Sequence, residues 1–419
     1  MSSYQIPGVY REEVFHAPVG RLLTGVPVFL ALIAKQVVDS HAGRFFLRPL
    51  SSPGIWLVKT RHDQVSSDEP EPFSVGKRFE DSFQDIAPHG YLVPAVRGFF
   101  ENGGQRCYVQ LVCFDRGVTA VSAFRSGLET LMPMDTVDLV CAPDIMWPQH
   151  GSETVTELDE DRVDEMQSAM LEHCDLLGDR FAILDSLPGA SVVRVSEQRQ
   201  GMAGDNGALY YPWLRVERRE DSSQGFIPPS GHVAGVYART DGRIGVHKAP
   251  ANEVLEGVQA LNVRLNQEAL GQLNLSHVNC IRAFPGRGIR VWGARTISNQ
   301  PAWVYVSVRR LFLTTARWIE RTMAADAFEP NDAQLWARIG RQLNGYFTDL
   351  YERGALKGQT ASEAFYVKCD AETNLSEVIE QGQVVTEIGL APATPNEFVV
   401  VHVIQQAAGV TLAGPMRPR

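Results

Sequence analysis

Hydrophobic and polar positions follow two different periods along this chain, and the changes of period predict where strands and helices lie. Residues 26–34, 107–112, 137–142 and 180–184 are short apolar or alternating runs, which are typical of strands. Residues 159–177 instead carry apolar side chains at helical spacing, on one side of an amphipathic helix. Strand, helix and strand at this spacing predict a βαβ unit and a parallel sheet.

The second half of the chain predicts helices first and strands afterwards. Helical spacing is seen at 303–325 and at 331–353, where an apolar stripe is continuous and Asn331-Asp332 supply the cap. Strand-like runs close the chain at 364–369, 384–391 and 397–405. The sequence therefore predicts a mixed fold, with α/β units in its middle and α+β structure near its end.

A turn at Asn102, Gly103 and Gly104 raises the question of a phosphate-binding loop. Phosphate loops follow a strand and precede a helix, whereas this turn follows a helix and precedes a strand. We therefore interpret it as a helix end at which Asn-Gly supplies the left-handed residue. The glycines beside Arg287 and Arg290 are interpreted as a tight turn entering a strand, and a nucleotide site is the alternative.

Composition narrows the class of protein. The 419 residues suffice for two or three domains, and a hydrophobic content of 44% with 21% charged residues is ordinary for a globular protein. The net charge of −10 argues against nucleic-acid binding. The apolar run 26–34 is too short to span a membrane, and the N-terminus does not have the pattern of a secretory signal. The six cysteines form no Cys-x-x-Cys pair, so we expect reduced thiols, with no metal and no cofactor.

Three carboxylates are the candidates for catalytic chemistry. Asp138, Asp144 and Asp185 lie at or just beyond the ends of predicted parallel strands, where α/β enzymes place catalytic groups. Aspartate also begins turns, and no histidine, lysine or serine motif accompanies these three. A soluble α/β enzyme with strand-end carboxylates is therefore kept as the alternative to a structural role.

The two ends of the chain are both strand-like. Residues 397–405, EFVVVHVIQ, combine high strand propensity with almost no charge, and such a strand must be paired because an open edge invites aggregation. Residues 7–14, PGVYREEV, form a second strand-like terminus. Two such ends favour strand exchange between subunits.

Motifs along nearly the whole chain resemble the tail sheath proteins of contractile phages and of phage-tail-like contractile injection systems. They occur in family order: PGVYREEV (7–14), YLVPAVRGFFENGGQRCYVQLV (91–112), ALYYPWLRV (208–216), PPSGHVAGVYARTD (228–241), GIRVWGART (288–296), YVSVRRLFLTTARWI (305–319), FEPNDAQLWARI (328–339), GALKGQTASEAFYVKCD (354–370) and EIGLAPATPNEFVVVHV (387–403).

The resemblance implies a domain plan. Residues 1–50 would form an N-terminal arm and the first part of an inner domain, and 51–90 a surface excursion. Residues 91–280 would form an outer α/β domain, 281–405 an inner, tube-facing domain, and 406–419 a flexible tail.

The resemblance also implies sites of contact between subunits. Arms from two neighbours would complete a four-stranded sheet on the strands at 365–370 and 384–391. The arm residues would be Tyr4, Val9, Tyr10, Phe398, Val400, Val401 and Ile404, and the accepting residues Phe365, Val367, Val385 and Ile388. Arg338 and Arg341 are candidates to contact an inner tube, and a solvated helix face is the alternative.

Family properties then suggest a structural protein and not an enzyme. Hexameric rings stacked helically would surround the inner tube, and their contraction would drive the tube through a target envelope. Baseplate and terminal cap proteins would be further partners, and sheath paralogues are left open. Neither nucleic acid nor direct membrane insertion is expected. The protein would be made and assembled in the bacterial cytoplasm, in a particle that can be released.

Overall fold

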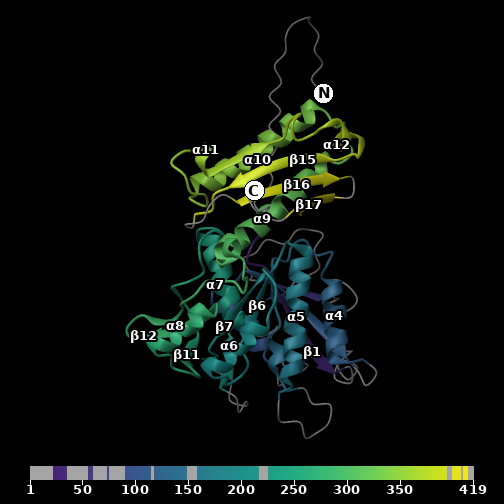
Figure 1. The fold of residues 1–419 in the computed structure, drawn as a ribbon. Helices are drawn as coiled ribbons and strands as arrows, with labels where there is room; N and C mark the ends of the chain where they lie inside the picture. The colour runs from purple at the N-terminus through teal and green to yellow at the C-terminus, as the bar shows by residue number, and fades with distance from the viewer. Residues whose placement is uncertain are drawn as a thin grey trace, which may run out of the picture.

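The structure, a computed structural model, describes residues 22–34, 55–59, 73–74, 90–114, 118–148, 158–216, 225–393, 399–406 and 409–413. Within these residues the chain forms two lobes, each with its own hydrophobic core (Figure 1). The larger lobe, in the lower half of Figure 1, combines a long sheet with helices on both faces. The smaller lobe lies above it and carries the C-terminal strands. This mixed α/β structure confirms the predicted fold class.

A ten-stranded sheet forms the frame of the larger lobe. Its strand order is β10-β13-β12-β7-β6-β5-β1-β4-β2-β3. The strands are β1 (Pro27–Ala34), β2 (Ile55–Lys59), β3 (Phe73–Ser74), β4 (Arg106–Phe114), β5 (Leu139–Cys141), β6 (Phe181–Asp185), β7 (Gly207–Tyr211), β10 (Glu253–Val254), β12 (Val278–Phe284) and β13 (Gly288–Val291). The central pairings from β4 through β1, β5, β6 and β7 to β12 are parallel, whereas β2 and β13 run antiparallel to their neighbours β4 and β12.

Helices cover both faces of this sheet, which is why its central strands are mostly apolar. α3 (Leu92–Glu101) and α7 (Ser230–Arg243) pack together on one face, and α4 (Ala120–Thr130) and α5 (Glu160–Leu177) pack together on the other. Phe181 of β6 meets Tyr237 of α7 at a ring distance of 6.5 Å, and the next residue, Ala182, points to the α5 face. All five residues of β6 are therefore buried.

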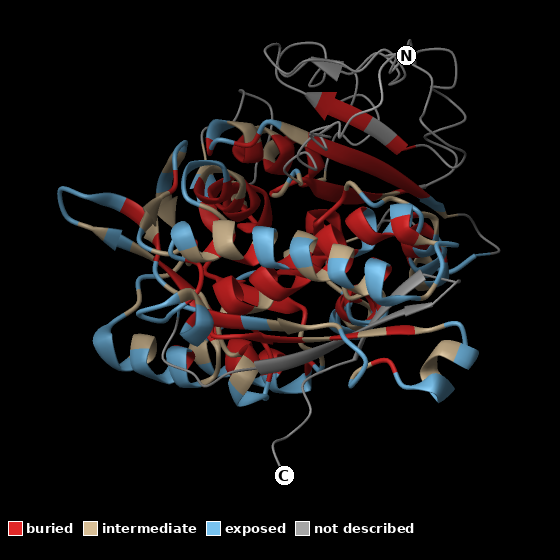
Figure 2. Cartoon of the chain, turned by 90° about the horizontal axis from the view of Figure 1, so that it is seen from above, coloured by how far each residue is buried: buried red, intermediate tan, exposed pale blue. Residues whose placement is uncertain are grey.

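The remaining elements of the larger lobe flank the sheet. They are η1 (Pro143–Met146), α6 (Val192–Gly201), α8 (Gln267–Leu275) and a small sheet of order β11-β8-β9, made of β8 (Leu214–Val216), β9 (Phe226–Ile227) and β11 (Val258–Leu261). From above, buried residues fill the interior and exposed residues follow the outward turns of the helices (Figure 2). No helix of the described segments has the length and apolarity needed to cross a membrane.

Two long helices and a four-stranded antiparallel sheet form the smaller lobe. The helices are α9 (Val306–Met323) and α10 (Ala333–Glu352), with η2 (Pro301–Trp303), η3 (Ala324–Asp326), α11 (Ala361–Ala364) and α12 (Ser376–Glu380) around them. The sheet has the order β14-β15-β16-β17, from β14 (Phe365–Lys368), β15 (Val384–Leu390), β16 (Val399–Gln406) and β17 (Gly409–Ala413).

The apolar stripe of α10 is buried as the sequence predicts. Its core-facing residues are Leu335, Ile339, Leu343, Phe347 and Leu350. The Asp332 side chain caps the helix by accepting from the N–H groups of Gln334 and Leu335 at 2.9 and 3.0 Å. The helix, its buried apolar stripe and its cap thus agree with the sequence pattern of residues 331–353.

Helix α9 belongs to both lobes. Val306 and Leu313 pack into the core of the larger lobe, whereas Leu311, Phe312 and Ile319 pack into the smaller one. The helix is buried on almost every side, so it joins the two cores through packed side chains.

The lobes differ from the predicted domain plan at four places. Strands β2 and β3 lie in the predicted surface excursion 51–90 but pair in the larger sheet, and Ile55, Leu57 and Val58 of β2 are buried in its core. Strand β1 lies within the predicted first part of the inner domain but pairs in the middle of the larger sheet. Strands β12 and β13 extend this sheet to Val291, past the predicted boundary at 280. Strand β17 lies in the segment 406–419, for which a flexible tail is predicted. The differences at β1, β2 and β12 have one cause: apolar segments distant in sequence pair side by side in one sheet.

Candidate functional site

Asp144, one of the three candidate catalytic carboxylates, caps a helix. The N–H groups of Tyr91 and Leu92 donate to its Oδ1 at 2.5 and 2.9 Å, at the start of α3. Burial raises the pKa of Asp144 to about 7, although these two hydrogen bonds act in the opposite direction. A Cβ on Gly90 would lie 2.7 Å from the same oxygen, so the chain closes tightly over the carboxyl group. Its contacts are those of a structural cap.

Asp185 plays the same part for α7. The N–H of Ser230, the first residue of that helix, donates to Asp185 Oδ1 at 2.8 Å. Burial raises the pKa of Asp185 to about 7, and the hydrogen bonds from Ser230 lower it in part. The strand end thus holds the N-terminus of a distant helix in the core, which is neither a local turn nor a catalytic site.

Asp138 belongs to a buried ion cluster that joins the lobes. Its two carboxylate oxygens accept from the N–H groups of Gly25 and Val26 at 2.9 and 2.6 Å. Arg310 of α9 donates to Asp138 at 3.0 Å and to both oxygens of Asp241 in α7 at 2.9 and 2.6 Å. All three charged side chains are at most 5% exposed. We call Arg310, Asp138 and Asp241 the interlobe triad.

Further contacts of α9 strengthen this junction. The guanidinium of Arg310 lies 4.8 Å from the ring centre of Tyr237. Arg309 donates to Asn206 Oδ1 at 2.6 Å, and Arg317 donates to the carbonyl of Asp135 at 2.7 Å. Sequence reasoning missed these arginines. The sequence did carry a signal for Arg310. This residue follows Val306 by four positions and precedes Leu313 by three, so it shares the helix face that packs into the core of the larger lobe.

The three candidate carboxylates do not form one site. Asp138 precedes β5, whereas Asp144 follows that strand and caps α3, so the two lie at opposite ends of β5. Each is engaged by backbone N–H groups. Within the described residues, no group of three or more His, Cys, Asp or Glu side chains could hold a metal ion. The arrangement supplies helix caps and an ion cluster.

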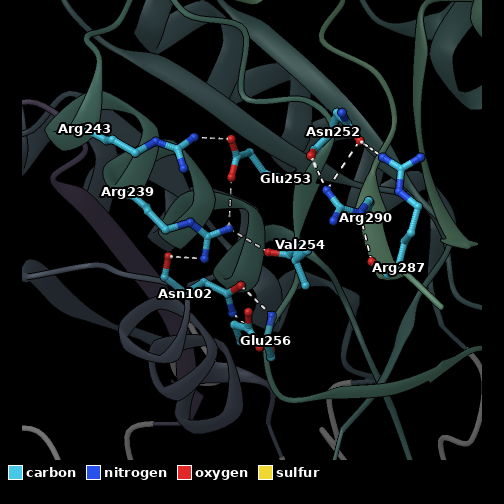
Figure 3. A network of polar contacts seen from close by, with 9 residues as sticks. All are labelled: Asn102, Arg239, Arg243, Asn252, Glu253, Val254, Glu256, Arg287 and Arg290. Carbon is cyan, nitrogen blue, oxygen red and sulfur yellow. Dashed lines mark hydrogen bonds and ion pairs between the residues drawn. The ribbon is translucent and has the colours of Figure 1, made fainter.

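The Asn-Gly-Gly turn ends helix α3, as the sequence analysis inferred. Asn102 is fully buried, and its side chain donates to the carbonyls of Gly98 and Glu256 at 2.8 and 3.2 Å (Figure 3). It also accepts from the N–H of Glu256 at 2.9 Å. Gly103 has φ of 100°, and a Cβ on Gly104 would lie 2.3 Å from the ring of Phe99. The turn therefore ties α3 to the strand region that follows α7.

The predicted accepting strands lie in the smaller lobe. Phe365 and Ile388 are buried in its core, and Val367 and Val385 are half-buried. β14 pairs with one edge of β15, with Val367 opposite Ile388. The other edge of β15 pairs with β16 of the same chain.

The predicted arm residues are described only in part. Val400, Val401 and Ile404 lie in β16, opposite Gly389, Ile388 and Val385. In this single chain, β16 therefore occupies the place that the prediction gives to a neighbour's arm. Tyr4, Val9, Tyr10 and Phe398 lie outside the described residues. Pairing between chains stays a prediction.

The two candidate tube-facing arginines have different surroundings. Arg338 pairs with Asp326 at 3.0 Å and with Glu329 at 3.6 Å. Arg341 lines a cleft of about 610 Å³ between α10, α9 and the end of α7, next to the stacked rings of Trp318 and Tyr346, which are 3.9 Å apart. Contact with a tube stays a prediction for both.

Similarity to known proteins agrees with the resemblance. Residues 154–297 match the phage tail sheath protein central domain, and 298–406 match the phage tail sheath C-terminal domain. A tail sheath protein of Vibrio phage KVP40 is 24% identical over 55% of this chain and 36% of the relative. A putative prophage major tail sheath protein of Pseudomonas aeruginosa is 24% identical over 41% of this chain and 44% of the relative. The chain thus spans less than half the length of these curated relatives.

Solved structures match over nearly the full chain. A chain of the anti-feeding prophage baseplate is 29% identical, with a TM-score of 0.67, over 95% of this chain and 98% of that chain. The anti-feeding prophage helical sheath in its contracted state is 28% identical, with a TM-score of 0.66 and the same coverage. The contracted PVC sheath complex of an extracellular contractile injection system is 26% identical, with a TM-score of 0.65, over 95% and 97%. Because the two family domains together cover more than half of its residues, this chain belongs to the phage tail sheath protein family.

Proposed function

We propose that this chain is the structural subunit of the contractile sheath of a phage-tail-like injection system. Hexameric rings of the subunit stack helically around an inner tube, and their contraction drives the tube through a target envelope. The observation that carries the proposal is the match to the anti-feeding prophage sheath in its contracted state, over 95% of this chain and 98% of that chain. A phage tail is the other particle in which a member of this family can serve.

The contacts of the described residues support a role without catalysis. The three strand-end carboxylates hold helix ends and the interlobe triad, so their chemistry is used within the fold. The energy for contraction is then stored in the extended sheath and released when its subunits repack. Helix α9 suits this role, because a joint packed into both cores transmits force between lobes.

Strand exchange is the mode of connection that we propose between subunits. Residues 4–14 of one neighbour and 397–405 of another complete the sheet on 365–370 and 384–391. The pairing of β16 with β15 within one chain supports this, because the same backbone hydrogen bonds can form with the strand of a neighbour. Each such bond contributes about 0.5–1.5 kcal/mol net.

Contact with the tube is proposed for α10. Arg341 is the better candidate of the pair, since Arg338 would have to exchange its partners Asp326 and Glu329 for a tube carboxylate. Exposed ion pairs contribute about 0.2–1 kcal/mol each, but the contact repeats at every subunit. Particles that stay extended after Arg338→Glu with Arg341→Glu would exclude both residues.

The remaining partners follow from the role. The inner tube protein, the baseplate and a terminal cap contact the sheath, and the particle is assembled in the bacterial cytoplasm before it can be released. Neither nucleic acid nor insertion into a membrane is part of this proposal.

Negative-stain microscopy of the purified protein tests the central proposal. Striated cylinders or rings are expected, and deletion of residues 1–14 should prevent them while the larger lobe stays folded by circular dichroism. A monodisperse monomer or dimer at high concentration, together with turnover of a substrate that is lost in an Asp185→Ala variant whose circular dichroism matches the wild type, would favour the enzyme alternative instead. Full-length cylinders from the deletion variant would refute the exchange of N-terminal strands.

A further inference from the structure

An aromatic and basic surface lies on the β12–β13 hairpin. The rings of Phe284 and Trp292 are 4.6 Å apart, and Trp292 is 42% exposed. The guanidinium groups of Arg282 and Arg287 lie 4.9 and 5.4 Å from the centre of the Phe284 ring. We call these four residues the hairpin patch. Tryptophan and arginine are the residue types that dominate binding energy at protein interfaces.

The positive charges of this hairpin have no carboxylate partner among the described residues. Arg287 and Arg290 donate to Asn252 instead, Arg290 to its carbonyl at 2.7 Å (Figure 3). The nearby carboxylate, Glu253, is paired with Arg239 and Arg243 of α7. On a chain with a net charge of −10, the hairpin patch is therefore a local positive surface available to an external carboxylate.

The hairpin is also held rigidly. Asn252, with φ of 58°, accepts hydrogen bonds from Arg287 and Arg290. Arg239 donates to the Val254 carbonyl at 2.7 Å (Figure 3). The N–H of Asn252 donates to Val291 at 2.7 Å, which closes the strand pair. A surface fixed in this way loses little conformational freedom on binding.

A complementary acidic surface lies on the first two turns of α5. Asp161 and Glu165 are exposed and one turn apart, and no cation of the described residues forms an ion pair with either. The flanking acids of the same helix are satisfied, Glu160 by Arg194 and Glu172 by Arg125. Like charges at i and i+4 repel within an isolated helix, so an external cation would relieve them.

The elements that carry the two surfaces lie on different sides of one subunit. In Figure 1 the labels β12 and α8 lie at the left of the larger lobe, and α5 and α4 lie at the right. One molecule therefore cannot join its own two surfaces, whereas two copies placed side by side can. A contact between different surfaces of identical subunits is head-to-tail, and it repeats into a ring or a helix.

We propose that the hairpin patch of one subunit docks on the acidic turns of α5 in the next subunit. This contact rests on the proposed function, because it is the lateral contact of larger lobes within an assembled sheath. Arg282 and Arg287 would pair with Asp161 and Glu165, and the aromatic pair would supply the apolar centre of the interface.

Charge reversal tests the pairing on the full chain. We expect both Arg282→Glu with Arg287→Glu and Asp161→Lys with Glu165→Lys to raise the protein concentration needed for assembly by about tenfold or more, as measured by sedimentation and negative stain. The fourfold variant, which swaps the charges, should recover assembly. Arg264→Glu with Arg321→Glu is the matched control, since both arginines are exposed and the charge change is the same.

Each outcome separates this contact from the function on which it rests. If the wild type forms cylinders and either reversal is neutral, or the fourfold variant fails to recover, the docking is wrong and the sheath function stands. If only the hairpin reversal impairs assembly, the hairpin binds another partner and the pairing is equally refuted. If the wild type forms no cylinders, the proposed function fails and this contact fails with it. Circular dichroism of each variant checks that the fold is intact.

Discussion

Replacing Arg310 with methionine is the sharpest test of how the two lobes are joined. Methionine keeps most of the side-chain volume but removes the cation of the interlobe triad, and Asp138 and Asp241 stay buried without it. Breaking a buried ion pair by removing one partner destabilises by about 3–5 kcal/mol, because an uncompensated charge remains. This is a large share of the roughly 5–15 kcal/mol that stabilises a typical protein.

The loss should depend on pH in a definite direction. Burial raises the pKa of Asp241, and Arg310 lowers it in part. Without Arg310 this pKa rises further, so the folded state holds the proton more tightly than the unfolded state does. The contribution of Asp241 to stability is then fully present below the ordinary pKa of aspartate, and it is lost as the pH rises through the folded-state pKa. We expect Arg310→Met to be more destabilised at pH 8 than at pH 5.

Urea unfolding of the dilute, unassembled chain measures this effect. The triple variant Arg310→Met, Asp138→Asn, Asp241→Asn removes all three charges and should recover much of the loss, because no buried charge is left unpaired. Arg321→Met, an exposed arginine on the same helix, should stay within about 0.5 kcal/mol of wild type. A loss below about 1 kcal/mol in Arg310→Met, or a loss that is the same at both pH values, would refute the role of the triad.

Three further changes test other parts of the structure. Since the folded-state pKa of Asp144 is raised to about 7, its contribution to stability falls as pH rises from about 4 to 7, and Asp144→Asn should flatten this fall in thermal melts. Gly231→Ala places a Cβ 2.3 Å from the backbone oxygen of Ala95 and should destabilise by about 1–3 kcal/mol, whereas Gly242→Ala, on the same helix with open space around it, should not. Val401→Pro removes a strand N–H opposite Ile388 and should block assembly seen by microscopy without unfolding the larger lobe; intact cylinders would contradict it.

Local patterns allowed the main elements to be predicted. The apolar face of α5 and the buried stripe of α10 are written at helical spacing, and β6 follows α5 as the βαβ unit requires. Each depends on residues that are close in sequence. The Asn102 turn was also interpretable, because helix ends carry a local glycine signal.

Long-range partners could not be predicted in this way. Asp144 caps a helix that begins 52 residues earlier, and Asp185 caps one that begins 45 residues later. An aspartate at a strand end looks the same whether it binds a substrate or a distant helix. The sequence therefore located these carboxylates correctly, but only the three-dimensional contacts decide which role they play. The place of β1 within the larger sheet was missed for the same reason.

The C-terminal strand has a further consequence for assembly. A free chain already seals the edge of β15 with its own β16, through seven residue pairs from Val384 with Gln405 to Leu390 with Val399. If subunits exchange this strand, the pairs that are lost within one chain are regained with its neighbour, so little free energy is gained per exchange. The strand must first open, which makes spontaneous exchange between free chains slow. Two free chains must both open before they can exchange strands, whereas a preformed ring that presents an open β15 edge requires only the joining chain to open. Growth from a template, such as a baseplate, should therefore be faster than the nucleation of new cylinders. Addition of preformed ring fragments to purified protein should abolish the lag phase of assembly, as followed by light scattering. Assembly with the same lag after such seeding would argue against strand exchange as the slow step.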